Sequence, residues 1–132
     1  MSILLDTHFL IELVNKQSAD GFSEEDMFEQ AVGNSSFKVS LVSLWEVEIK
    51  FRIGKLHITC PLSEWTSIVM SAGGLVIPIT EDHILADIGP EVGTRDPFDR
   101  LLVSTAAAEN CKLLTRDHRL LSHPSAWKSI SP

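Results

Sequence analysis

The sequence predicts an α/β fold in which a central parallel sheet is flanked by helices. Short apolar segments typical of strands alternate along the chain with segments of helical periodicity, and this alternation favours parallel strands. A helix predicted over residues 96–110 is apolar on nearly every side, which indicates that it is buried. The chain has 132 residues, 44% of them hydrophobic, so we expect a single domain over residues 1–132 with a real core.

The individual elements follow from apolar spacing and from helix start and stop signals. Strands are predicted over residues 3–6, 37–41, 75–79, 113–115 and 127–130. Helices are predicted over residues 7–15, 23–32, 43–53, 61–72, 80–88 and 96–110, with a helical turn at 117–121. Pro61 marks the start of one helix, and Gly54 marks the end of the helix before it.

The charge distribution bears on the possible partners. The formal net charge is −7, which by itself argues against nucleic acid, because phosphate binding is mostly electrostatic. An acidic run from Asp20 to Glu29 accounts for part of this charge and is expected to be a solvated helix face. Basic residues gather elsewhere: between residues 95 and 119 lie Arg95, Arg100, Arg116 and Arg119. Divalent cations held by nearby carboxylates would make this region more positive still.

The start of the chain and its two cysteines predict the compartment. The stretch MSILLDTHFLIELV carries Asp6 and has neither a basic region nor a small-residue cleavage site. We therefore expect neither a signal peptide nor a membrane span. Cys60 and Cys111 form no motif and are expected to be reduced. Together these features predict a cytoplasmic protein that makes no membrane contact.

Four acids stand out because they lie at or near the starts of elements on one side of the predicted sheet: Asp6, Glu46, Asp99 and Asp117. Each has a local interpretation. Asp6 and Asp117 can cap the helices that follow them, and Asp99 can face the positive end of a helix capped by Asp96. Glu46 can form an S-x-x-E capping box with Ser43 and an ion pair with Lys50.

The local interpretation does not explain why all four carboxylates lie on the same side of the sheet. Carboxylates that converge on one cleft repel one another, and burial strengthens the repulsion. A hard cation such as Mg²⁺ or Mn²⁺, which prefers oxygen ligands, would stabilise such a cluster. Open α/β sheets also bind ligands beyond the carboxyl ends of their strands. The sequence therefore predicts a divalent-metal site for phosphodiester chemistry at this edge.

Four segments resemble the successive signatures of PIN-domain ribonucleases, in particular those of the VapC-like toxins of type II toxin–antitoxin modules. The segments are Asp6-Thr7-His8, SLWEVEIKFRIGKL from Ser43, RDPFDRLLVSTA from Arg95 and LLTRDHRL from Leu113. They occur in the expected order along nearly the whole chain. The resemblance implies a three-layer PIN-like fold, metal-dependent endonucleolytic cleavage of RNA, a small antitoxin partner and a homodimer.

The resemblance carries the family's acidic residues over to Asp6, Glu46, Asp99 and Asp117. Asp6 and Asp99 are then expected to be the main ligands of Mg²⁺ or Mn²⁺. Asp117 and Glu46 are expected to complete the cluster directly or through water, and one of them to orient the attacking water. A supporting shell is predicted at Thr7, Thr115 and Asp96. Contacts with substrate phosphates are predicted for Arg95, Arg100, Arg116 and Arg119. The alternative for Arg100 and Arg119 is that they simply pair with nearby acids.

Two other protein classes share part of this pattern. A phosphatase of the haloacid-dehalogenase kind has an Asp after its first strand, but it usually needs a second Asp where His8 stands. The alternative to an enzyme is a receiver-like module or a catalytically inactive PIN-type module that acts by binding. A receiver usually has a Lys late in its sheet, whereas Lys112 precedes its strand. An inactive PIN domain is expected to lack one of the acids, and all four are present.

The aromatic and histidine residues indicate less. We expect Trp45, Trp65 and Phe51 to lie in the core rather than to stack on bases. His8 and His118 adjoin two of the acids and are expected at the rim of the site, because their spacing does not suggest a zinc site.

Overall fold

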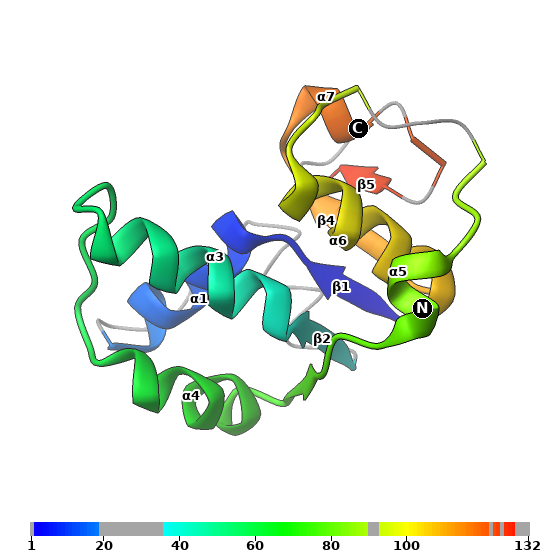
Figure 1. Cartoon of the computed structure of the whole chain (residues 1–132). Coiled ribbons are helices and arrows are strands. Elements are labelled where there is room, and N and C mark those ends of the chain that lie inside the picture. The colour runs from blue at the N-terminus through cyan, green and yellow to red at the C-terminus, as the bar shows by residue number, and fades with distance from the viewer. Residues whose placement is uncertain (1, 19–35, 90–92, 122, 125, 129–132) are drawn as a thin grey trace.

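The described residues form a five-stranded parallel sheet with helices on both faces (Figure 1). The structure is a computed structural model and describes residues 2–18, 36–89, 93–121, 123–124 and 126–128. The strands are β1 (Ile3–Leu5), β2 (Phe37–Ser40), β3 (Gly74–Ile77), β4 (Lys112–Thr115) and β5 (Ala126–Lys128). Their order across the sheet is β3-β2-β1-β4-β5, and every pairing is parallel. The predicted parallel α/β fold is confirmed.

The helices connect the strands and cover the sheet. They are α1 (Thr7–Ser18), α3 (Leu41–Arg52), α4 (Trp65–Ser71), α5 (Glu81–Leu85), α6 (Pro97–Ala108) and α7 (His118–Leu121). A 3₁₀ turn, η1 (Leu62–Glu64), precedes α4. The helix predicted over residues 23–32, which carries the acidic run, lies outside the described residues.

The core has two parts because β1 is buried on both faces. Ile3 and Leu5 belong to a cluster that includes side chains of α1, α3 and α4. Leu4, which points to the other face, belongs to a cluster with Leu102 and Val103 of α6. Each of these buried aliphatic side chains contributes roughly 1.5–3 kcal/mol relative to an exposed one. The result is the three-layer arrangement of helices, sheet and helices that the resemblance implies.

The strand order determines where a ligand site can form. From β1 the chain runs outward to β2 and β3 on one side, and it then returns to place β4 and β5 on the other side. The direction of winding therefore changes between β1 and β4, which are paired neighbours. Loops diverge at such a switch point and leave a crevice beyond the carboxyl ends of the strands. Asp6 directly follows β1, and Asp117 follows β4 by two residues.

The bounds of several helices differ from those predicted. Helix α3 begins at Leu41 rather than residue 43, and its N-cap is Ser40, whose side chain accepts a hydrogen bond from the Val42 amide. The predicted helix over residues 61–72 is divided into η1 and α4. Helix α5 is shorter than predicted because Ala86 adopts an extended conformation, with ψ of 135°. Gly54, as predicted, follows the end of α3 and has a φ of 75°.

The prediction that three aromatic residues lie in the core is correct for one of them. Trp65 is 1% exposed and packs between α4 and the sheet, whereas Trp45 is 54% and Phe51 45% exposed. Trp45 instead contacts Phe98 of α6 edge to face, with ring centroids 5.3 Å apart. Helical spacing of apolar residues identified α3, but it did not distinguish the face of α3 that packs on α1 from the face left open.

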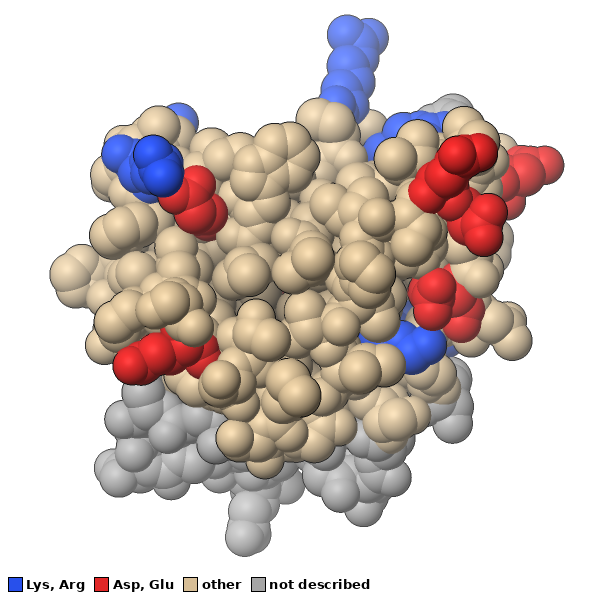
Figure 2. All heavy atoms as spheres, turned by 60° about the horizontal axis from the view of Figure 1, so that its bottom comes forward, with Lys and Arg blue, Asp and Glu red and all other residues tan. Residues whose placement is uncertain are grey.

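Three further features concern the surface charge, the helix lengths and the cysteines. On the face shown in Figure 2, the charged side chains lie near the margin and the centre carries uncharged residues. Among the described residues, no helix combines the length and apolar character needed to cross a membrane. Cys60 and Cys111 are free cysteines, and Cys111 is buried just after α6.

Candidate active site

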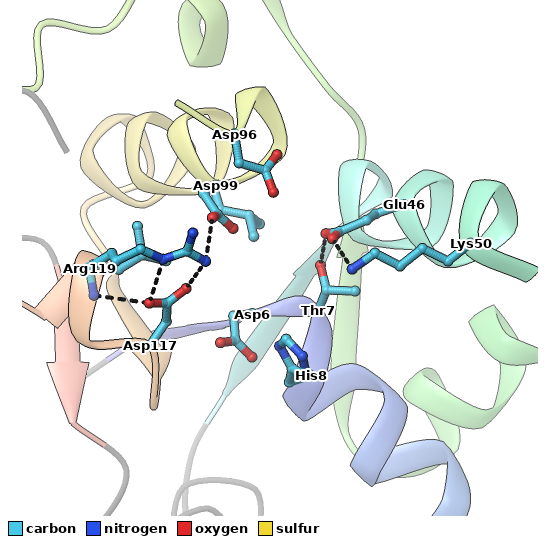
Figure 3. A pocket seen from close by; sticks show the side chains of 11 residues that line it. Asp6, Thr7, His8, Glu46, Lys50, Asp96, Asp99, Asp117 and Arg119 are labelled. Atoms are coloured by element: carbon cyan, nitrogen blue, oxygen red, sulfur yellow. Dashed lines mark hydrogen bonds and ion pairs between the residues drawn. The ribbon is translucent and has the colours of Figure 1, made fainter. Parts of the chain in front are cut away.

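The four predicted acids come together in one pocket at the carboxyl edge of the sheet (Figure 3). Asp6 comes from the end of β1, Glu46 from α3, Asp99 from the first turn of α6, and Asp117 from the segment between β4 and α7. The pocket has a volume of about 80 Å³. Its lining comprises Asp6, Thr7, His8, Glu46, Lys50, Asp96, Asp99, Leu102, Asp117, Arg119 and Leu120.

Asp6 is buried where β1 passes into α1. One of its carboxylate oxygens accepts a hydrogen bond from the Phe9 amide at 2.9 Å, so the residue also caps α1 as the local interpretation predicts. Burial raises the pKa of Asp6 above its ordinary value, while hydrogen bonds from Thr115 and from the Phe9 amide oppose the increase. Thr115 is itself fully buried, and its hydroxyl oxygen accepts the Asp117 amide at 3.0 Å. It therefore contacts two of the four acids.

Glu46 is buried on α3 between a hydroxyl and an ammonium group. Thr7 Oγ1 donates to Glu46 Oε1 at 2.6 Å, and Lys50 Nζ lies 2.7 Å from Glu46 Oε2. The predicted ion pair with Lys50 is thus present. The predicted capping box is wrong, because Ser40 caps the helix and Ser43 is buried within it, 3.2 Å from the Thr7 hydroxyl.

Asp99 carries a strongly perturbed carboxylate. Burial, followed by repulsion from Asp96, Glu46 and Asp117, raises its pKa from 3.8 to about 6, although Arg119 opposes the increase. Among the described residues, its Oδ2 is a buried oxygen without a hydrogen-bond partner. Asp96, the neighbouring acid, caps α6 as predicted by accepting the Phe98 amide at 2.9 Å.

Asp117 is held by Arg119. The guanidinium donates from Nε to Asp117 Oδ1 at 3.1 Å and from Nη2 to Oδ2 at 2.8 Å. Asp117 Oδ1 also accepts the Arg119 amide at 2.9 Å, which is the predicted local capping role. The hydrogen bond from Arg119 is the main reason why the pKa of Asp117 lies below its ordinary value. The same Nη2 lies 3.8 Å from Asp99 Oδ2.

The four predicted phosphate-binding arginines separate into two groups. Arg116 and Arg119 line a second pocket of about 410 Å³, together with His8 and Phe9, that shares Asp6 and Asp117 with the first. Arg116 pairs with Glu12 at 3.0 Å, and its Cζ lies 4.4 Å from the centre of the Phe9 ring. Arg95 and Arg100 are exposed and line neither of these two pockets.

Sequence reasoning did not assign Lys50 to the site. It identified Lys50 as the helical partner of Glu46, but the structure also places this residue in the pocket wall. The spacing of four residues on α3 could have suggested this, because side chains at that spacing share one face of a helix. Leu102 and Leu120, which line the pocket as apolar residues, carry no sequence signal beyond their apolar spacing.

The donor set fits a hard divalent cation. Five carboxylates line one small pocket, and among the described residues the buried Oδ2 of Asp99 has no hydrogen-bond partner. As the side chains lie in this structure, no group of three or more His, Cys, Asp or Glu among the described residues forms a ready ligand set. Lys50 and Arg119 instead pair with Glu46 and Asp117. Occupation by a metal therefore requires some of these side chains to move.

The fold and the pocket define a class of protein: a parallel α/β domain with carboxylates gathered at its switch point. Residues 3–124 match the PIN domain family, and the chain belongs to this family.

Two solved structures are similar to the chain over 96% of both lengths. One is VapBC2 from Rickettsia felis bound to a DNA fragment from its promoter, with 17% identity and a TM-score of 0.58. The other is a toxin–antitoxin complex from Klebsiella pneumoniae, with 20% identity and a TM-score of 0.61. At these identities the likeness concerns the fold. No curated protein matches the sequence significantly.

Proposed function

We propose that the chain is a metal-dependent endoribonuclease and the toxin of a toxin–antitoxin pair. The observation that carries the proposal is the pocket of five carboxylates at the switch point of a PIN-domain sheet, in which the buried Oδ2 of Asp99 accepts no hydrogen bond from the described residues. A group of acids in such a position is costly unless a cation compensates it. The similarity to toxin–antitoxin structures supports the biological context.

The roles of the acids follow from their surroundings. Asp6 and Asp99 would hold Mg²⁺ or Mn²⁺, and Asp117 and Glu46 would complete the site directly or through water. When bound, the ion lowers the pKa of a water molecule and stabilises charge that develops on the phosphoryl oxygens. Glu46, fixed by Thr7 at 2.6 Å, is well placed to orient the attacking water. Thr115 orients Asp6, and Asp96 adds negative charge beside Asp99.

The arginines would position the RNA backbone. Arg116 and Arg119 line the pocket next to the carboxylates, so we propose that they contact the phosphates nearest to the cleavage site. His8 lines the same pocket and would add a hydrogen-bond donor at its rim. Arg95 and Arg100 lie outside both pockets, and we propose that they contact phosphates further along the strand.

Cleavage of RNA is the first expected result. The purified protein should cleave single-stranded or looped RNA with Mg²⁺ or Mn²⁺ and lose this activity in EDTA. A metal-activated water does not need the ribose 2′-hydroxyl as nucleophile, so the products should carry a 5′-phosphate and a 3′-hydroxyl. End-group analysis of the products measures this. Cyclic phosphate ends, or full activity in EDTA, would contradict the mechanism and favour a PIN-type binding module.

An inhibitory partner is the second expected result. We propose a small antitoxin that inserts an arginine among the carboxylates, because a guanidinium is the cation best suited to bind carboxylates in pairs. Trp45, exposed on α3, offers it an apolar contact, whereas Trp65 is buried and does not. The product of a small neighbouring reading frame should co-purify with the chain and inhibit it. If its Arg→Ala variant inhibits fully, the proposed insertion is wrong.

We also propose that the chain forms a homodimer and acts in the cytoplasm. Large apolar side chains that are exposed in the isolated chain offer a surface for self-association: among them are Trp45, Phe51, Ile53, Met70, Leu75, Ile84 and Leu85. The free cysteines agree with a reducing compartment.

A further inference from the structure

Arg119 already supplies a cation to the carboxylate pocket. Its guanidinium forms two hydrogen bonds with Asp117, at 3.1 and 2.8 Å, and its Nη2 lies 3.8 Å from Asp99 Oδ2 (Figure 3). It therefore contacts two of the four acids proposed to hold the metal. The backbone of Arg119 is also held beside Asp117, because the Arg119 amide donates to Asp117 Oδ1 at 2.9 Å.

The guanidinium and a metal ion compete for the same oxygens. Both carboxylate oxygens of Asp117 accept hydrogen bonds from Arg119. A carboxylate oxygen binds a metal ion through a lone pair, and the N–H groups of the guanidinium occupy lone pairs of these same oxygens. The guanidinium has no lone pair of its own to offer the ion in exchange.

The side chain of Arg119 can leave the carboxylates without breaking the fold. It is 60% exposed, whereas the side chains of Asp99 and Asp117 are 14% and 24% exposed. Arg119 also lines the second pocket of about 410 Å³, so there is open space beside its side chain into which the guanidinium can turn. Lys50 is different, because its ammonium group pairs with Glu46 on the opposite wall of the pocket.

We propose that Arg119 is a built-in counter-ion of the carboxylate pocket, and that a divalent cation binds only after displacing its guanidinium from Asp117 and Asp99. The inference rests on the proposed metal site. It makes Arg119 a residue that sets the metal affinity of the free protein. It also explains why the acids, as they lie in this structure, do not yet form a ready ligand set.

The test measures Mg²⁺ binding by calorimetry in the wild type and in Arg119→Gln, Arg119→Lys and Arg116→Gln. Arg119→Gln should bind Mg²⁺ about tenfold more tightly, the size expected when one charge-assisted competitor is removed. Arg119→Lys keeps the charge but loses the paired hydrogen bonds, so its affinity should be intermediate. Arg116→Gln removes an equal positive charge next to the site, so it controls for the effect of net charge on Mg²⁺ binding. It should change the Mg²⁺ affinity by less than about twofold, because a charge screened by solvent acts weakly.

A second measurement follows displacement in the wild type itself. The Arg119 Nε–H signal, assigned by its absence in Arg119→Lys, should shift as Mg²⁺ saturates the protein, since its hydrogen bond to Asp117 is lost. Equal or weaker binding by Arg119→Gln, or an unmoved Nε–H signal at saturation, would overturn the inference and leave the metal site intact. If none of the proteins binds Mg²⁺, the proposed metal site itself is wrong, and the inference is overturned with it.

Discussion

Replacement of Asp99 by asparagine should lower the rate of RNA cleavage by about a hundred- to a thousandfold. The carboxylate has a buried Oδ2 without a hydrogen-bond partner and faces Glu46 and Asp117 across the pocket. Stabilisation of transition-state charge by a bound metal is worth several kcal/mol, and each 1.4 kcal/mol corresponds to about a tenfold change in rate. Asparagine keeps the shape of the side chain but removes the charge that would hold the ion.

The matched control for this change is Asp82→Asn. Asp82 lies in the first turn of α5, as Asp99 does in α6, but it is exposed and does not line the carboxylate pocket. Its variant should cleave RNA within about twofold of the wild type, because a surface charge remote from the site has a small effect. The measurement is the single-turnover rate at saturating Mg²⁺ or Mn²⁺. An Asp99→Asn protein that cleaves as fast as Asp82→Asn would remove Asp99 from the catalytic group.

The same substitution should stabilise the metal-free protein at neutral pH. The pKa of Asp99 is about 6 in the folded state and 3.8 when unperturbed, so the folded protein binds this proton more tightly than the unfolded chain. Its ionised form therefore destabilises the fold above about pH 6, and the cost decreases as the pH falls through 6 toward 3.8. The full pKa shift corresponds to about 3 kcal/mol in the free energy of unfolding. Because Asp99 is partly exposed to solvent, which screens its charge, we expect Asp99→Asn to gain about 1–2 kcal/mol.

Urea unfolding in EDTA at pH 7.5 and pH 4.5 measures this. Asp99→Asn should exceed the wild type in free energy of unfolding at pH 7.5, and most of the difference should disappear at pH 4.5. The comparison of two proteins at each pH isolates Asp99 from Asp6, whose pKa is also raised. If Asp99 acts mainly as a charge near the helix N-terminus, its loss instead costs a few tenths to about 1 kcal/mol at pH 7.5. That opposite sign would support the purely local interpretation.

The sequence was most informative where local rules and tertiary structure agree. The alternation of strands and helices predicted the parallel sheet, and the apolar helix at 96–110 was located to within two residues as α6. The acids following β1 and β4 could be grouped because parallel strands present their carboxyl ends at one edge. Asp6, Asp96 and Asp117 also cap helices, so their local and site interpretations are both consistent with the structure.

Predictions failed where packing partners distant in sequence decide the outcome. The S-x-x-E spacing of Ser43 and Glu46 matches a capping box, yet Ser43 is buried beside Thr7 of α1, and Ser40 caps the helix. Trp45 remains 54% exposed although its ring contacts Phe98 of α6, a residue distant in sequence. The contact of Arg119 with Asp99 joins α7 to α6, and no pattern within either helix indicates it.

The central claim is that these carboxylates form a metal site and are not merely helix caps. The most direct test is thermal unfolding in EDTA and in millimolar Mg²⁺ or Mn²⁺ for the wild type, Asp6→Asn, Asp99→Asn and the control Asp82→Asn. A metal that binds only the folded protein raises the melting temperature by mass action. We predict a clear rise for the wild type and Asp82→Asn and a sharply reduced rise for Asp6→Asn and Asp99→Asn. An equal rise in all four proteins, or none in the wild type, would contradict the account.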